Sequence, residues 1–135
     1  ITNSQEISLG LSIDCNGNNV PDSCDINEGT SFDADSNGVP DECQQSFIRA
    51  DCNGNGGTDI ADAIFLLNYL FASAGAPQCL NACDANDSGA LDVADGIFTL
   101  AALFTGGPPP MSPYPLCGID PTSTALECAA FVVCP

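Results

Sequence analysis

Acidic and amide side chains recur at one fixed spacing in four twelve-residue stretches of the chain, named here loop 1 (14–25), loop 2 (33–44), loop 3 (51–62) and loop 4 (84–95). With the first aspartate as position 1, each loop has an oxygen-bearing side chain at positions 1, 3, 5, 9 and 12. Ca²⁺ takes six to eight oxygen ligands, and a twelve-residue loop supplies them from these positions and the position-7 carbonyl. The spacing therefore predicts about four calcium sites.

Loops 3 and 4 fit this pattern at every position, including a glycine at position 6, where the chain turns with positive φ. The predicted ligands of loop 3 are Asp51, Asn53, Asn55, the Gly57 carbonyl, Asp59 and Asp62. Those of loop 4 are Asp84, Asn86, Ser88, the Ala90 carbonyl, Asp92 and Asp95.

Loops 1 and 2 each depart from the pattern at one position. Loop 1 has Asn19 at position 6, a residue type that tolerates left-handed backbone. Loop 2 has a neutral glutamine at position 12, so we expect weaker closure there. The predicted ligands are Asp14, Asn16, Asn18, the Val20 carbonyl, Asp22 and Asp25 in loop 1, and Asp33, Asp35, Asn37, the Val39 carbonyl, Asp41 and Gln44 in loop 2.

The charge of the chain points to the same chemistry. Its 135 residues include 18 acids, one base (Arg49) and no histidine, for a formal charge of −17. Twelve of the 14 aspartates stand at predicted ligand positions. Since each Ca²⁺ carries two positive charges, four ions would bring −17 to −9. A chain with one basic residue has no surface for nucleic acid, and 44% hydrophobic residues argue against disorder.

Loops 3 and 4 must be positioned by the segments around them, which form an internal repeat. Residues 51–71 recur 33 positions later as 84–104, with 11 of 21 positions identical. Hydrophobic spacing after each loop predicts a helix, with Asp59 and Asp92 as N-caps. The predicted apolar faces are Ile60, Ala63, Ile64, Leu67, Leu70 and Phe71 in the first helix, and Val93, Ile97, Leu100, Leu103 and Phe104 in the second.

The rest of the chain is expected to be strand or loop. Apolar residues alternate in 1–13, which predicts a strand, and the apolar stretch 126–134 is a candidate second strand. Residues 105–124 are predicted to form an extended, proline-rich loop. The predicted fold class is therefore small, loop-rich and mainly α, stapled by calcium loops and disulfides, with short terminal strands. The expected divisions are 1–13, 14–45, 46–107 and 108–135.

Nine cysteines in a chain of this length indicate disulfides and an oxidising compartment. A Cys15–Cys24 bridge across loop 1 is plausible, and a Cys43–Cys52 bridge would join loops 2 and 3. Connectivity of the other five cannot be derived from the sequence, and one of them is expected to be unpaired or intermolecular: Cys79, Cys83, Cys117, Cys128 and Cys134. A zinc site is disfavoured by the lack of histidine.

Two resemblances follow from these motifs. Residues 51–71 and 84–104 resemble the paired calcium-loop-plus-helix repeats of type I dockerins, which have aspartate at position 12. Loops 1 and 2, with their Val-Pro-Asp sequences, are similar to the helix-free calcium repeats of thrombospondin type 3 arrays. The order of these pieces is similar to repeats in large secreted proteins of planctomycete-type bacteria. The resemblance implies calcium binding, but the helices carry no basic residues of the kind through which dockerins recognise cohesins.

These observations predict a secreted calcium-binding structural protein at a cell surface or in a matrix, and not an enzyme. No nucleophile–base pair is evident, and no apolar run reaches membrane-spanning length. One alternative is self-assembly into a fibre, in which strand 1–13 pairs with a neighbouring copy. Against this stands the interpretation that strand 1–13 pairs with 126–134 of its own chain. The other alternative is a dockerin-like module that binds a cohesin-like partner. We expect no N-glycan at Asn86, a predicted ligand, while 108–112 and 122–124 are either sites of O-linked sugars or an exposed spacer.

Overall fold

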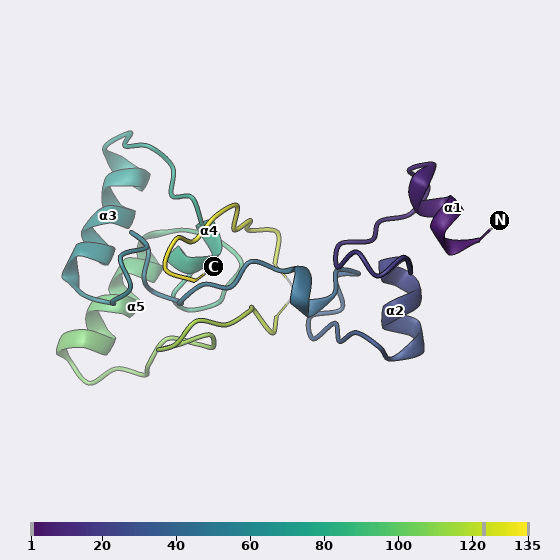
Figure 1. Ribbon diagram of the computed structural model, residues 1–135. Helices are drawn as coiled ribbons and strands as arrows, with labels where there is room; N and C mark the ends of the chain where they lie inside the picture. The colour runs from purple at the N-terminus through teal and green to yellow at the C-terminus, as the bar shows by residue number, and fades with distance from the viewer. Residues whose placement is uncertain (1, 123, 135) are drawn as a thin grey trace. The chain divides into compact units, whose positions relative to one another are not determined.

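The computed structural model describes residues 2–122 and 124–134, which form mostly loops and short helices (Figure 1). The chain divides into two compact units, Ile1–Gln44 and Gln45–Pro135. We refer to them as unit 1 and unit 2 and describe each by itself. None of the helices in the described ranges is long and apolar enough to cross a bilayer.

Unit 1 contains two short α-helices, α1 (Asn3–Ser8) and α2 (Asp22–Glu28), and one 3-10 turn, η1 (Asp41–Cys43). The prediction of a strand over 1–13 was wrong for its described residues, because a local capping box starts α1. The Thr2 hydroxyl accepts from the Gln5 N–H, and the Gln5 side chain accepts from the Thr2 N–H. The apolar residues behind the strand prediction are left on the surface: Leu9, Leu11 and Ile13.

Loop 1 is also not helix-free, because α2 begins inside it. Pro21 precedes the helix with φ near −56°, and Gly29 ends it at φ 80° in the left-handed conformation. Both residue types are common at these helix boundaries.

Unit 2 contains α3 (Ile60–Phe71), α4 (Leu80–Cys83) and α5 (Val93–Phe104), and α3 packs against α5 (Figure 1). The two predicted helices and their N-caps are present: Asp59 accepts from the Ala61 N–H, and Asp92 from the Ala94 N–H, both at 2.9 Å. The predicted strand over 126–134 is wrong in its described part. Among the residues that the structure describes, β-structure is limited to single bridges, at Phe47–Gly118 and Cys79–Cys128.

The helices bury only part of the face that the hydrophobic pattern predicts. Asp62 and Asp95 point into the loops that precede their helices, and this fixes the rotation of α3 and α5. In α3, Ala63 and Leu66 are therefore buried. Three residues of each predicted apolar face are instead exposed to about half their area or more: Ile60, Ile64 and Phe71 in α3, and Val93, Ile97 and Phe104 in α5.

Hydrophobic burial is confined to unit 2 among the described residues. One cluster includes Phe47, Ile48, Ala82 and Phe131, and a second surrounds Leu66. In unit 1 the buried side chains are prolines and polar groups: Pro21, Pro40, Asp22, Asp25 and Ser31. Unit 1 thus lacks the apolar core that stabilises most small domains.

The disulfides differ from the predicted ones. Loops 1 and 2 are joined by Cys15–Cys43, and loop 3 is joined to the end of α4 by Cys52–Cys83. The other two bonds attach the C-terminal segment, at Cys79–Cys128 and Cys117–Cys134. Cys24, the third residue of α2, is the free cysteine, because Cys15 pairs with Cys43. Four bonds in a chain of this size fit an oxidising extracellular environment.

Candidate calcium sites

All four loops have the same unusual backbone. Positions 4 and 6 lie in the left-handed region in every loop, although non-glycine residues occupy three of these eight positions. The φ values at position 6 are 68° (Asn19), 83° (Gly38), 97° (Gly56) and 83° (Gly89). Those at position 4 are 72° (Gly17), 57° (Ser36), 72° (Gly54) and 56° (Asp87). Left-handed backbone costs about 1–2 kcal/mol for a residue with a Cβ, so a compensating interaction is needed.

The position-1 aspartate provides part of that compensation. In loop 3, one oxygen of Asp51 accepts from the Asn55 N–H at 3.1 Å and the other from the Gly56 N–H at 2.8 Å. The equivalent aspartates of the other loops make the same pair of bonds, at 2.9–3.2 Å: Asp14, Asp33 and Asp84. Each loop therefore wraps its backbone around the carboxylate at position 1.

Positions 3 and 5 turn inward by the same local bonds. The position-3 oxygen accepts from the position-5 N–H at 3.1–3.2 Å in all four loops, and the position-5 oxygen accepts from the position-7 N–H at 2.8–3.4 Å. These bonds fix the side chains of seven amides and acids and one serine: Asn16, Asn18, Asp35, Asn37, Asn53, Asn55 and Asn86, with Ser88. The remaining predicted ligands are the position-7 carbonyls of Val20, Val39, Gly57 and Ala90.

Position 12 closes loops 3 and 4. Asp62 accepts from the Asn53 N–H at 3.1 Å and from the Asp59 N–H at 2.8 Å, so its carboxylate spans the loop. Asp95 makes the equivalent bonds to Asn86 and Asp92, at 3.4 and 3.1 Å. The capping box that begins each helix is thus also the closure of the loop.

The carboxylates at positions 1 and 12 of loops 3 and 4 are buried, at 0–1% exposure. Burial raises the pKa of Asp62 to about 6, and the charges of Asp51 and Asp59 add to the shift. Burial likewise raises the pKa of Asp95 to about 7, and the nearby Asp84 carboxylate adds to it. Like charges in a desolvated site repel each other. A divalent cation bound by these oxygens would offset that cost.

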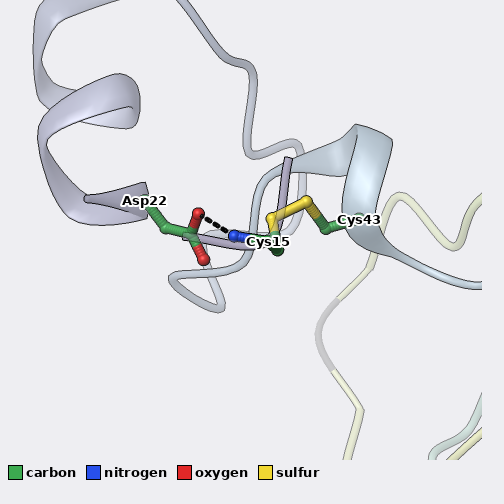
Figure 2. A group of neighbouring side chains, drawn as sticks. All are labelled: Cys15, Asp22 and Cys43. Atoms are coloured by element: carbon green, nitrogen blue, oxygen red, sulfur yellow. Dashed lines mark hydrogen bonds between the residues drawn. A yellow bond between two sulfur atoms is a disulfide. The ribbon is translucent and has the colours of Figure 1, made fainter. Parts of the chain in front are cut away.

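Loops 1 and 2 close differently, through position 9. Asp22 accepts from the Cys15 N–H at 2.9 Å, and Asp41 accepts from the Ala34 N–H at 3.0 Å. Figure 2 shows the Asp22 carboxylate beside Cys15 and Cys43, whose sulfurs are joined. This group therefore offers no thiolate and is not a zinc site.

In loops 1 and 2, the position-12 side chain is hydrogen-bonded to other predicted ligands of its own loop, and side-chain amides are the donors. Asp25 accepts from the Asn18 side-chain amide at 3.0 Å and from that of Asn16 at 3.3 Å. The Gln44 amide donates to Asp35 at 3.4 Å and to the Val39 carbonyl at 3.3 Å. Rotating an amide by half a turn exchanges its nitrogen for its oxygen, so these residues can turn oxygen towards a cation.

Two acids of unit 1 at predicted ligand positions have pKa values shifted in opposite directions. Burial and the neighbouring Asp33 raise the pKa of Asp35. In loop 1, although burial acts in the opposite direction, hydrogen bonds from Thr30, Asn18 and Asn16 lower the pKa of Asp25. Acids in the two loops are thus held in different protonation environments.

Two contacts around loop 1 were not predicted from the sequence. The Thr30 hydroxyl donates to Asp25 at 2.8 Å, and Glu42 of η1 accepts from the Asn16 amide at 3.1 Å. Thr30 lies between loops 1 and 2, and Glu42 is not at a ligand position of loop 2. The spacing of the repeats therefore gives no signal for either residue.

The donor sets of the four loops fit calcium. Each loop offers oxygen only, from carboxylates, amides or a hydroxyl and a main-chain carbonyl, which are the ligands of a hard cation. Arg49, the only basic side chain, pairs with Asp87 and Asp120, the two aspartates outside the predicted ligand sets. The twelve aspartates at predicted ligand positions therefore have no basic side chain as a partner.

Comparisons with protein-family models, curated proteins and solved structures find no match to this chain.

Proposed function

We propose that this chain is an extracellular calcium-binding structural protein in which bound Ca²⁺ takes the role of the hydrophobic core that unit 1 lacks. The observation that carries the proposal is the shared geometry of the loops, in which four separate stretches have one backbone and one hydrogen-bond pattern around the position-1 aspartate. The matching sequence positions are the ones that calcium loops use.

The binding energy would be used for folding. The acids of each loop repel one another when it closes, and closing is favourable only if a cation is held between them. Binding to the folded state alone adds to stability by mass action. At extracellular, millimolar calcium, sites with Kd of about 10⁻⁴–10⁻³ M are filled, so the ions would act as fixed structural parts.

Counting bound ions tests this proposal. The chain is stripped with EGTA, returned to calcium, and weighed by native mass spectrometry. We expect about four Ca²⁺ per chain, one for each loop. A chain that keeps its fold and retains no calcium at millimolar concentration would contradict the proposal.

Self-assembly is the role we propose for the calcium-loaded protein. Its support comes from unit 2, where Ile60, Ile64 and Phe71 of α3 are exposed, as are the residues 33 positions later in α5. Exposed apolar residues gathered on helices mark interaction sites. Because the repeat places the same residue types on both helices, the two surfaces suit contact between copies of one chain. This self-assembly does not use a donated N-terminal strand, because residues 3–8 are helical.

The second candidate is a dockerin-like module that binds a separate, cohesin-like protein. The same exposed residues favour it, because the first of them on each helix, Ile60 and Val93, directly follows the position-9 aspartate of loop 3 or loop 4. Sedimentation in calcium separates the two roles. Assembly of the pure protein supports the structural role, whereas a stable monomer at high concentration favours the docking role.

A further inference from the structure

Arg49 connects three separate segments of unit 2 from a fully buried position. Its Nη1 donates to the main-chain carbonyl of Asp84 at 2.8 Å, and its Nε donates to the carbonyl of Ser112 at 3.1 Å. Its Nη2 lies 3.0 Å from a carboxylate oxygen of Asp120. The guanidinium also stands over the ring of Phe47, 5.4 Å from its centre. Its side chain is 0% exposed.

The contacts of Arg49 cross from one repeat to the other. Arg49 stands two residues before loop 3, yet its side chain contacts the first residue of loop 4. The residue two positions before loop 4 is Ala82, whose methyl group cannot make a matching contact to loop 3. Loops 3 and 4 share backbone and closure, so Arg49 is a specific difference between them.

The same guanidinium holds the segment 112–122. Asp120 accepts from the Asn81 amide at 2.8 Å as well as pairing with Arg49. The Thr122 hydroxyl lies 2.7 Å from Asp120 and 2.8 Å from Asp87, a residue of loop 4 that is itself 3.6 Å from Arg49. Although burial alone would raise it, hydrogen bonds from Thr122 and Asn81 and the charge of Arg49 lower the pKa of Asp120.

Breaking such a cluster leaves a charge buried without its partner, which costs far more than an exposed ion pair contributes. The main chain of Asp84 and the segment 112–122 are therefore held in place together or released together. Asp84 is also the residue around which loop 4 wraps.

We propose that Arg49 is a positioning residue for loop 4, and that it couples calcium binding in loop 4 to closure of the segment 112–122. This inference rests on the proposed calcium binding. Coupling between two binding or ordering events is reciprocal. Calcium in loop 4 therefore orders 112–122 through Arg49, and loss of the Arg49 contacts weakens calcium binding in loop 4 and not in loop 3.

Amide NMR resonances of Gly56 and Gly89 report the two loops separately. Each N–H donates to the position-1 aspartate of its own loop, at 2.8 and 2.9 Å. The variant Arg49→Lys keeps the charge but loses the planar fork of donors. In a calcium titration we expect the midpoint at Gly89 to rise about tenfold, as for other residues that orient a metal ligand. The midpoint at Gly56 is expected to stay unchanged.

Hydrogen exchange on the unmodified chain supplies a second test that does not depend on the folding of a variant. The N–H of Gly118 donates to Phe47 and that of Thr122 to Asp120. We expect calcium to slow exchange at both amides. Unaltered exchange would overturn the coupling, as would equal shifts of the Gly56 and Gly89 midpoints in Arg49→Lys. If neither glycine of the unmodified chain responds to calcium, the proposed calcium binding itself fails.

Discussion

Carboxylates at position 12 of loops 3 and 4 perform two tasks at once. Asp62 accepts a hydrogen bond from the Asp59 N–H, and this bond caps the start of α3. It also accepts one from the Asn53 N–H, and this second bond closes the loop. Asp95 does the same for α5. Both acids are the third residues of their helices, and both are at most 1% exposed. Their burial beside another acid is the residue-scale reason for expecting a bound cation.

Replacing Asp62 by alanine should remove one calcium ion from the chain. The change takes away a carboxylate ligand and the contact that closes loop 3, while the other loops keep their ligands. Native mass spectrometry in calcium should show one ion fewer than in the unmodified protein. The control is Glu127→Gln, which removes one acid at an exposed position outside the loops. Equal ion counts in Asp62→Ala and the unmodified chain would show that loop 3 is not a site.

Adjacent glycines of loop 3 give a matched pair for testing its backbone. Gly56 has φ 97°, and a Cβ there would lie 3.7 Å from Val133, whereas Gly57 has no positive φ and open space around it. Gly56→Ala should lower the free energy of unfolding in calcium by about 1–2 kcal/mol, because left-handed backbone is strained for alanine. Gly57→Ala keeps its carbonyl and should cost less than about 0.5 kcal/mol. Urea unfolding curves compare the two, and equal losses would refute the left-handed geometry.

Among the secondary-structure elements, the two helices of the internal repeat could be predicted from the sequence, whereas the structure of the non-repeated terminal segments could not. The helices after loops 3 and 4 and their N-caps follow from spacing, and both are present. The terminal strands were inferred from apolar residues alone, and the capping box at Thr2–Gln5 prevailed over that pattern in the first of them. The rotation of α3 could not be read from hydrophobicity, because Asp62 sets it from the loop side.

Cysteine connectivity also lies beyond the sequence, because it depends on which loops approach each other. Cys15–Cys43 joins loop 1 to loop 2, and Cys52–Cys83 joins loop 3 to α4. Position within a loop carries no such information. The Asp and Asn spacing, in contrast, specifies a local structure, so each candidate ligand could be named in advance.

Cys24 should be the residue that reacts with iodoacetamide in the unreduced protein. It is the free thiol of the structure and is partly exposed, whereas the other eight cysteines are paired. Alkylation under denaturing conditions, followed by peptide mapping, should place a single label at residue 24. A label on Cys52 or Cys83 would contradict the structure's pairing.

At the scale of the molecule, the two units differ in what stabilises them. Unit 2 has buried aromatic and aliphatic residues and three disulfides, while unit 1 has one disulfide and a buried set of prolines and polar groups. Burial of apolar area is the main favourable term in folding. Unit 1 should therefore depend more strongly on its ions than unit 2 does.

Assembly of whole molecules should depend on the exposed residues of α3 and α5. The double variant Ile64→Ser with Ile97→Ser removes one half-exposed apolar side chain from each helix. Sedimentation velocity in calcium should show fewer or smaller assemblies than for the unmodified chain. Leu116→Ser serves as a control, because it removes an exposed apolar residue outside the helices. Assembly that is unaffected by the double variant would exclude these helix surfaces from self-association.

Hydrogen exchange of unit 1 with and without calcium tests the role of the ions most directly. In calcium, amides of loops 1 and 2 such as Asn19 and Gly38, which donate to aspartates, should exchange slowly. In EGTA they should exchange at nearly unprotected rates, while amides in the core of unit 2 keep more of their protection. Equal protection of residues 14–44 in both conditions would contradict the claim that calcium replaces the missing core.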